Sequence, residues 1–292
     1  MIEGGVTSLY ENHPIIHYSL FIISLFMLFS FTDQLNNYVQ ISFPPKRIVS
    51  LVPSQTELLH SLGLEEEVAG ITKFCIHPES WFKTKKRVGG TKTIKADVVK
   101  SLLPDLIIAN KEENVKEQIE ELRTIAPVWV SDIHTVEDAL VMIQSVGKLV
   151  NKMKEADKIA DGIMRGFQQM QQLNANPRTA YLIWKDPYMA AGGDTFIHDI
   201  MNRCGFNNVY ADYKRYPEIA IQQLSLLNCQ LLILSSEPYP FKEDHIKQLQ
   251  QLLPNTLIVL ADGEFFSWYG SRLLLAPAYL TDWRTRCLEQ LV

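Results

Sequence analysis

The residues of this chain that could take part in chemistry follow directly after its predicted strands. In open α/β sheets, ligands bind beyond the carboxyl ends of parallel strands, so these positions nominate a site without any further motif. The candidates are Ser54, Lys73, Phe74, His77, Asn110, Trp184, Tyr188, Glu237, Phe265, Trp268 and Tyr269. Aromatic side chains dominate the set, which is typical of an apolar cleft for a large flat ligand. The alternative for each aromatic is that it caps a sheet end as part of the core.

Cys75 and His77 are the two neighbouring residues that could take several chemical roles. A neutral imidazole and a thiol two residues apart could bind a metal or act as base and nucleophile. Pro78 holds His77 extended, so its ring would point away from any helix. The simpler alternative is a buried Cys75 and a His77 that makes one hydrogen bond. The chain has no G-x-S-x-G, G-x-x-x-x-G-K-[ST], H-E-x-x-H or G-x-G-x-x-G motif, so we do not expect an enzyme.

Composition restricts the class of protein. With 292 residues, 47% of them hydrophobic and 21% charged, the chain can bury a sizeable core. The net charge is -5 and the 28 basic residues are dispersed, which argues against a nucleic-acid partner. No C-x-x-C pair occurs among the four cysteines, so we expect free thiols, with disulfides as the alternative. They are Cys75, Cys204, Cys229 and Cys287.

An apolar run over residues 15–31 has about the length of a signal-peptide core. Its upstream flank carries Glu3 and Glu11 but no Lys or Arg, while the nearest basic residues, Lys46 and Arg47, lie downstream. A signal peptide has the opposite polarity. The run therefore reads either as a degenerate export or anchor segment, or as an upstream extension of a protein that begins near Met27.

Strand and helix patterns alternate along the rest of the chain. A hairpin is predicted over residues 32–41, around Asn36-Asn37. Continuous β-rich runs predict buried strands at 47–52, 68–71, 105–109, 128–130, 179–183, 231–234 and 256–260. Helices are predicted at 54–62, 96–103, 113–124, 136–149, 195–204, 221–227, 242–253 and 271–291. Ser54 to Glu57 has the spacing of a capping box, which would open the first helix at Ser54.

A helix over residues 154–173 separates two similar halves. Its apolar residues recur three or four apart, the period of one helix face: Ala156, Ile159, Ala160, Ile163, Met164, Phe167 and Met170. On either side, residues 101–108 and 225–233 match as a helix end that runs into a buried strand. We predict two Rossmann-like α/β lobes joined by one long backbone helix. The boundaries are 1–31 for the apolar segment, 32–150 and 176–292 for the lobes, and 151–175 for the helix.

These features resemble the substrate-binding proteins of metal-chelate ABC importers, the helical-backbone group that includes cobalamin-binding and iron-siderophore-binding proteins. The resemblance rests on the segment from Lys46 to Leu59 with its P-S-x-T-E-L motif, on the strand entry at 103–107 and on the helix after the first lobe. It covers about Thr32 to the carboxyl end. It implies two lobes around one rigid helix, a ligand held between them with little hinge closure, and docking onto ABC permease and ATPase subunits.

The cobalamin-binding branch is the most similar. Tyr216-Pro217-Glu218 resembles its aromatic-proline segment at the cleft, and Arg272 and Lys73 are the cleft cations, with no Arg cluster for a catecholate siderophore. The resemblance places permease-docking carboxylates at Glu113, Glu117 and Glu218. The chain departs from the family pattern in two places. Asn110 stands where this branch carries a large aromatic, and Gln222 stands where the second lobe's docking carboxylate is expected.

The function we expect is capture of cobalamin or a related corrinoid for import, by a monomer in the periplasm or anchored in the cell envelope. No catalytic residue, resident cofactor or metal is expected. One alternative is an iron-siderophore or heme-type binding protein, and another is a cytoplasmic corrinoid-handling enzyme that uses Cys75 and His77. A third, a metal-ion receptor, needs three or four converging His, Asp or Glu ligands, whereas the predicted cleft offers plainly only His77 and Glu237.

Overall fold

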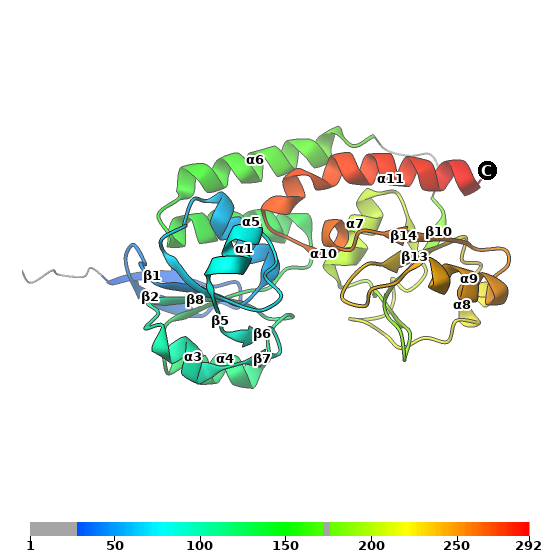
Figure 1. Ribbon diagram of the computed structural model, residues 1–292. Helices are drawn as coiled ribbons and strands as arrows, with labels where there is room; N and C mark the ends of the chain where they lie inside the picture. Colours follow the sequence, from blue (N-terminus) through cyan, green and yellow to red (C-terminus); the bar gives the residue numbers. More distant parts are fainter. Residues whose placement is uncertain (1–27, 172–175, 292) are drawn as a thin grey trace, which may run out of the picture.

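The computed structural model describes residues 28–171 and 176–291 and contains one parallel and one mainly parallel sheet, each with helices around it (Figure 1). The chain first forms an antiparallel hairpin of β1 (Leu28–Thr32) and β2 (Tyr38–Ser42), as predicted. Asn36 has φ 63° in the turn, and the Asp33 carboxylate accepts backbone N–H bonds from Leu35 and Asn37. The hairpin begins four residues earlier than predicted, so residues 28–31 of the apolar run belong to it, and residues 15–27 lie outside the described residues.

The first lobe is built on a five-stranded sheet of order β5-β4-β3-β8-β9, with every neighbouring pair parallel. Its strands are β3 (Ile48–Ser50), β4 (Val68–Ile71), β5 (Lys86–Arg87), β8 (Leu106–Asn110) and β9 (Val128–Ser131). Its helices are α1 (Pro53–Ser61), α2 (Glu79–Thr84), α3 (Ala96–Ser101), α4 (Lys116–Arg123) and α5 (Val136–Leu149). The short elements α2, β5, β6 (Gly89–Gly90) and β7 (Thr93–Ile94) were not predicted, because two to six residues carry no readable periodicity.

The second lobe has a smaller sheet of order β11-β10-β13-β14, with β12 also paired to β10. Its strands are β10 (Arg178–Trp184), β11 (Met189–Ala190), β12 (Asn207–Asn208), β13 (Leu231–Ser235) and β14 (Leu257–Ala261). Its helices are α7 (Phe196–Arg203), α8 (Gln223–Leu226), α9 (Glu243–Leu252) and α10 (Glu264–Ser267). The seven strands predicted from continuous β-rich runs are all present within a few residues of their expected bounds, as β3, β4, β8, β9, β10, β13 and β14.

The predicted capping box at Ser54 is wrong. Helix α1 begins at Pro53, its N-cap is Val52, and no side chain caps it. Proline at the first helical position has its φ already set for a helix and lacks the N–H that a cap would satisfy, so the helix starts one residue earlier. Ser54 therefore lies inside the first turn with its hydroxyl free for another role. A capping box does open α5, where Thr135 and Asp138 exchange hydrogen bonds.

The two lobes repeat one stabilising arrangement at corresponding places. Arg47 donates through Nε to the Leu102 carbonyl over 2.7 Å, and Arg178 donates to the Leu227 carbonyl over 2.8 Å. In the first lobe this bond ties the start of β3 to the end of α3, which leads into the neighbouring strand β8. In the second lobe it ties the start of β10 to the end of α8, which leads into the neighbouring strand β13. The backbone N–H groups of the same arginines donate to Asp105 and to Gln230. The match between residues 101–108 and 225–233 is thus a structural repeat.

Helix α6 (Met153–Gln169) begins one residue earlier and ends earlier than the predicted helix. The helix ends because the backbone of Met170 is already extended, while its side chain stays buried. Residues 172–175 lie outside the described part. The predicted face is otherwise buried, but Met164 was placed on it wrongly and is 42% exposed. No helix within residues 28–171 and 176–291 is long and apolar enough to cross a membrane.

The predicted closing helix is two elements, a 3-10 turn η1 (Ser271–Leu274) and α11 (Ala276–Leu291). Helix α11 runs beside α6 along the side of the molecule that both lobes share (Figure 1). Glycines of α6 allow the close approach, because a β-carbon on Gly162 would lie 2.6 Å from Leu274 Cδ2, and one on Gly166 would lie 2.9 Å from Pro277 Cγ. The second lobe is therefore held to α6 by packing as well as by chain connection.

The repeat provides a stability test. Leu103 and Asn228 occupy corresponding helix-to-strand turns of the two lobes and have φ angles of 48° and 50°. The left-handed region costs an ordinary residue roughly 1–2 kcal/mol, whereas asparagine tolerates it. Because Leu103 is 74% exposed, Leu103→Asn removes strain with little loss of buried surface and should raise the free energy of unfolding by about 1 kcal/mol. Denaturant unfolding measures this.

The matched reverse variant is Asn228→Leu, which should lower the free energy of unfolding by a similar amount. A destabilised Leu103→Asn would show that the leucine makes a contribution at this turn that outweighs its backbone strain.

Candidate functional site

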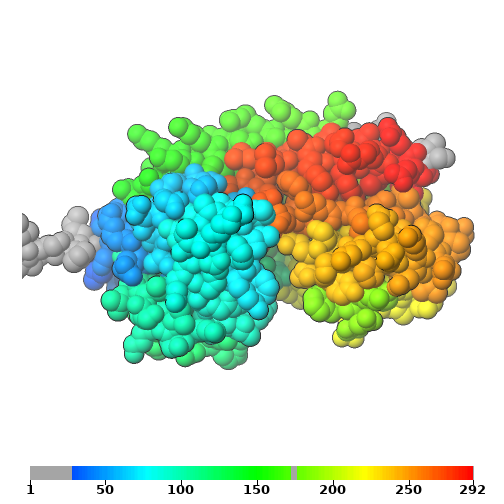
Figure 2. All heavy atoms as spheres, viewed as in Figure 1, coloured from blue at the N-terminus to red at the C-terminus, as the bar shows by residue number. Residues whose placement is uncertain are grey.

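The carboxyl ends of the two sheets face each other. His77, in the loop after β4, lies with its Nε2 atom 3.3 Å from Oε1 of Glu264, which follows β14. The same imidazole packs edge-on against Trp268, with ring centroids 5.6 Å apart. The space-filling view shows a furrow between the first lobe, with cyan atoms, and the second, with yellow and green atoms (Figure 2). The strand ends of the two lobes thus meet as the parallel-sheet rule predicts.

Arg272 joins the two lobes and is occupied by carboxylates. Its Nε and Nη2 atoms donate to Glu57 of α1 over 3.0 and 2.7 Å, and Nη1 lies 2.6 Å from Glu264 of α10. The guanidinium also stacks over Trp268 at 4.8 Å, and its side chain is 13% exposed. All three guanidinium nitrogens of Arg272 therefore already contact carboxylates, and Arg272 belongs to an ion network that joins the two lobes.

The Cys75 thiol and the His77 ring have different partners. Cys75 is fully buried, and its sulfur lies 3.1 and 3.2 Å from the hydroxyls of Thr56 and Thr72. Burial raises the pKa of this thiol, although the threonine hydrogen bonds oppose the shift. A nucleophilic cysteine needs a lowered pKa, so the geometry favours the simpler alternative, a structural Cys75 and a His77 turned toward Glu264. Within the described residues, no group of three His, Cys, Asp or Glu side chains could hold a metal ion.

Asn110 organises the loop after β8. Its Oδ1 atom accepts the backbone N–H groups of Glu112 and Glu113 over 2.8 and 2.9 Å, and its Nδ2 atom donates to the Ser131 hydroxyl. The side chain is buried, and Asn114 in turn accepts the Asn110 N–H over 2.9 Å. The position expected for a ligand-contacting aromatic is thus held by a residue that bends the chain and directs two carboxylates.

Glu112 and Glu113 extend from this loop toward the second lobe. Glu112 lies 3.5 Å from Arg215 Nη2. Glu113 forms no ion pair with any residue of the described ranges, and burial raises its pKa to about 7, with Glu112 and Glu237 adding to the shift and Lys92 opposing it. The residue predicted to dock a permease therefore faces the inter-lobe region. Sequence reasoning missed Glu112, although its place two residues after a buried strand was the same signal that selected Glu237.

Glu237 supplies a carboxylate from the opposite lobe. It accepts hydrogen bonds from the Ser267 hydroxyl over 2.9 Å and from Trp268 Nε1 over 2.7 Å. Burial raises the pKa of Glu237, while these two hydrogen bonds lower it. The junction between the lobes is consequently acidic on both sides.

The predicted aromatics fall into four environments. Phe74 and Trp184 are 50% and 40% exposed at the strand ends, where Lys73 lies over the Phe74 ring and Tyr239 packs edge-on against Trp184. Trp268 and Tyr269 are buried at the junction. Phe265 stacks on Tyr279 of α11 with centroids 4.2 Å apart, so it packs against a helix. The partly buried ones are Tyr188 and Tyr216.

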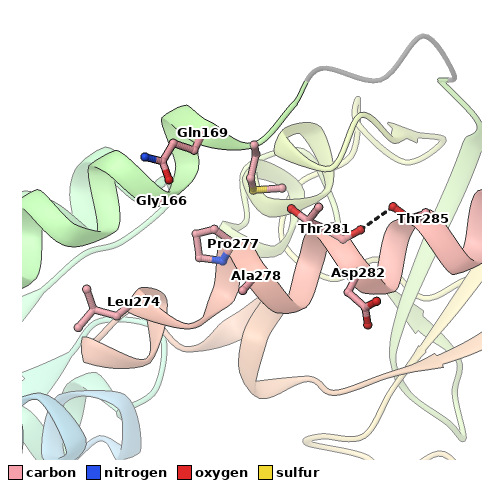
Figure 3. Close-up of a pocket in the computed structure, with 9 residues that line it drawn as sticks. Gly166, Gln169, Leu274, Pro277, Ala278, Thr281, Asp282 and Thr285 are labelled. Atoms are coloured by element: carbon pink, nitrogen blue, oxygen red, sulfur yellow. Dashed lines mark hydrogen bonds between the residues drawn. The ribbon is translucent and has the colours of Figure 1, made fainter.

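The remaining carboxylates predicted to dock a permease, Glu117 on α4 and Glu218 before α8, are exposed on different lobes. A separate groove of about 600 Å³ lies between α6 and α11 (Figure 3). It is lined by Gln169, Met170, Leu274, Pro277, Thr281 and Asp282, among others, and by none of the residues predicted from the strand ends. The groove is thus distinct from the inter-lobe site.

The raised pKa of Glu113 predicts a pH-dependent stability. Because the folded protein holds this proton more tightly than the unfolded chain does, the free energy of unfolding should fall as pH rises from about 4.5 to about 7. The loss is on the order of 1–3 kcal/mol. Glu113→Gln should remove this pH-dependent loss and be more stable than the wild type at pH 8.

Denaturant unfolding at pH 5 and pH 8 measures the difference, with Glu121→Gln, which changes an exposed carboxylate on α4, as control. Parallel pH profiles for wild type and Glu113→Gln would contradict the assignment.

Comparisons with known proteins agree with this fold. A vitamin B12-binding protein of Pectobacterium carotovorum subsp. carotovorum (strain PC1) is 23% identical over 242 residues, 80% of this chain and 86% of that relative. The crystal structure of the periplasmic vitamin B12 binding protein of Vibrio cholerae matches with a TM-score of 0.72 at 20% identity, covering 85% of this chain and 99% of that one. The apo periplasmic heme-binding protein from Roseiflexus sp. RS-1 matches with a TM-score of 0.73 at 18% identity, with the same coverage of 85% and 99%. The periplasmic binding protein family matches residues 48–255, most of the two lobes, and the chain belongs to that family.

Proposed function

We propose that this protein captures cobalamin or a related corrinoid in the furrow between its lobes. Members of the family are solute-binding proteins, not enzymes, and deliver small-molecule chelates to ABC permease and ATPase subunits. The observation that carries the choice of ligand is that each lobe presents an exposed aromatic and a carboxylate after its strands, Phe74 and Glu113 in the first lobe and Trp184 and Glu237 in the second. A corrin is a large flat ring whose rim carries amide N–H donors, which suits aromatic faces and carboxylate acceptors.

The charge of the furrow also bears on the choice. Arg272 and Arg215 are already paired with carboxylates, so neither is free to bind an anionic ligand. A heme or a catecholate siderophore carries several negative charges and would have to approach Glu112, Glu113 and Glu237. The second candidate, a heme-type chelate, is favoured by one feature, the exposed ammonium of Lys73 over the Phe74 ring.

The proposal extends to location and partners. We place the protein in the periplasm or at the cell envelope as a monomer that docks on its permease through one carboxylate from each lobe. Glu117 and Glu218 support this because each is exposed and they lie on different lobes. The inward position of Glu113 makes it the weaker docking candidate.

Calorimetry with cyanocobalamin tests the ligand. Trp184→Ala should weaken binding by about 1–3 kcal/mol, the scale of a large apolar side chain buried by a ligand. Tyr38→Ala is the control, because Tyr38 is an aromatic residue of the hairpin that is more exposed than Trp184 and lies outside the furrow. Heat of binding with hemin but none with any corrinoid would replace the proposal by the heme alternative.

Ligand binding should leave the arrangement of the lobes nearly unchanged. The Arg272 network already joins them without ligand, and no proline interrupts α6, so a bend would have to break helix hydrogen bonds. Small-angle scattering with and without cyanocobalamin should give nearly superimposable curves. A clear fall in the radius of gyration on binding would show that the lobes close like a hinge.

A further inference from the structure

Two buried hydroxyls at the junction of the lobes have no hydrogen-bond partner. Ser54 is 3% exposed and Tyr269 is 6% exposed, and neither its Oγ nor its Oη atom is bonded to any group of the described residues. Buried polar groups nearly always find a partner in the folded protein or in what it binds. The two hydroxyls therefore point to a group that is supplied from outside the chain.

The packing of the backbone brings the two hydroxyls together. A β-carbon on Gly270 would lie 2.2 Å from the Ser54 carbonyl oxygen, so the segment after Trp268 presses directly on the first turn of α1. Phe196 packs edge-on against the Tyr269 ring at 5.9 Å and holds its orientation. Because Tyr269 directly precedes Gly270, this contact also brings Tyr269 close to Ser54, and the Ser54 hydroxyl lowers the pKa of the Tyr269 phenol.

Glu113 lies in the loop after β8, the strand that pairs with β3, and β3 leads into Ser54, so Glu113 stands at the same sheet edge as Ser54. Burial is the main reason that the pKa of Tyr269 lies well above its usual range, and the Glu113 carboxylate is the strongest charge that adds to it. The groups that face Glu113 are Glu112 and Lys92 from its own lobe, Glu237 from the other, the Cys75 thiol, and the phenols of Tyr216 and Tyr269. Part of the Glu113 surface remains exposed, so the group is open to a ligand.

We infer that Ser54, Tyr269 and Glu113 form a polar subsite that receives an N–H donor of the bound ligand, either a carboxamide or an ammonium group. A carboxylate accepts hydrogen bonds only, and both hydroxyls can accept as well as donate. An anionic group of a ligand would face the carboxylates of Glu113 and Glu112, and the nearby cation Lys92 already donates to the Glu112 carbonyl. The inference rests on the proposed capture of a ligand between the lobes and adds which chemical group is selected there.

Proton linkage distinguishes this subsite from a structural role. An N–H donor stabilises the ionised carboxylate, so binding should release a proton from Glu113 below its pKa, and affinity should rise from pH 6 to pH 8. The probes are cyanocobalamin, which carries carboxamides, ferrioxamine B, which carries an ammonium group, and hemin, which carries two carboxylates. Calorimetry in two buffers of different ionisation enthalpy counts the protons released.

Three variants and one control complete the experiment. Glu113→Gln should abolish the proton release and weaken cyanocobalamin binding at pH 8 about tenfold. Tyr269→Phe and Ser54→Ala should each weaken binding several-fold, yet keep or raise thermal stability, because each removes a buried hydroxyl that has no partner. Glu121→Gln on α4 should match the wild type in every measurement.

The outcomes separate this inference from the proposed function. Equal cyanocobalamin affinity and no proton release in all variants would leave the proposed function standing and overturn the subsite. Binding of ferrioxamine B with the proton release, and no binding of cyanocobalamin, would overturn the corrinoid proposal and support the subsite. Tight binding of hemin that Glu113→Gln does not change, or binding of none of the three probes, would overturn both.

Discussion

The ion network of Arg272 is the interaction on which the inter-lobe geometry depends. A guanidinium that is mostly buried is stable only when carboxylates replace its lost water, and here Glu57 comes from α1 and Glu264 from α10. Satisfying both at once fixes η1 against the first lobe, where the Ser271 hydroxyl also bonds Ser61 over 2.9 Å. The close contact of Gly270 with Ser54 and the position of Trp268 between Arg272 and His77 then follow.

The network acts together with the packing of α6 on α11. A salt bridge alone would tolerate small rotations of one lobe against the other, because its energy changes gradually with distance. The contacts of Gly162 and Gly166 with Leu274 and Pro277 are steric, and a shift of a few tenths of an ångström would already cause overlap or open a void. A directional ion network inside the junction and a close helix contact outside it therefore restrain the same two bodies in different ways.

The sequence predicted those parts of the fold that depend on local patterns. Strands and helices, the hairpin turn at Asn36 and the repeat of the two lobes follow from periodicity and from turn chemistry within a few residues. Of the residues predicted after strands, His77 lies across the furrow from Glu264, a residue that was not predicted. The sequence could not predict which side chains distant in the chain contact each other. Arg272 looks like a free cation until Glu57, 215 residues away, lies beside it, and Asn110 looks like a missing aromatic until its bonds to the next loop are seen.

The same limit explains why the acidity of the furrow was overlooked, and the internal repeat supplies its cause. The last residues of β8 and β13, Asn110 and Ser235, each bond the backbone N–H of a glutamate two positions later, Glu112 over 2.8 Å and Glu237 over 3.3 Å. One arrangement, present once in each lobe, thus aims a carboxylate from each sheet at the junction between the lobes. Burial, and to a lesser extent nearby carboxylates, raise the pKa of Glu237 and of Glu113, the neighbour of Glu112, so the acidic junction costs stability until something neutralises it. A ligand that offers N–H donors or positive charge would relieve that cost, which makes the repeated carboxylates a physical reason for the protein to discriminate among ligands by charge.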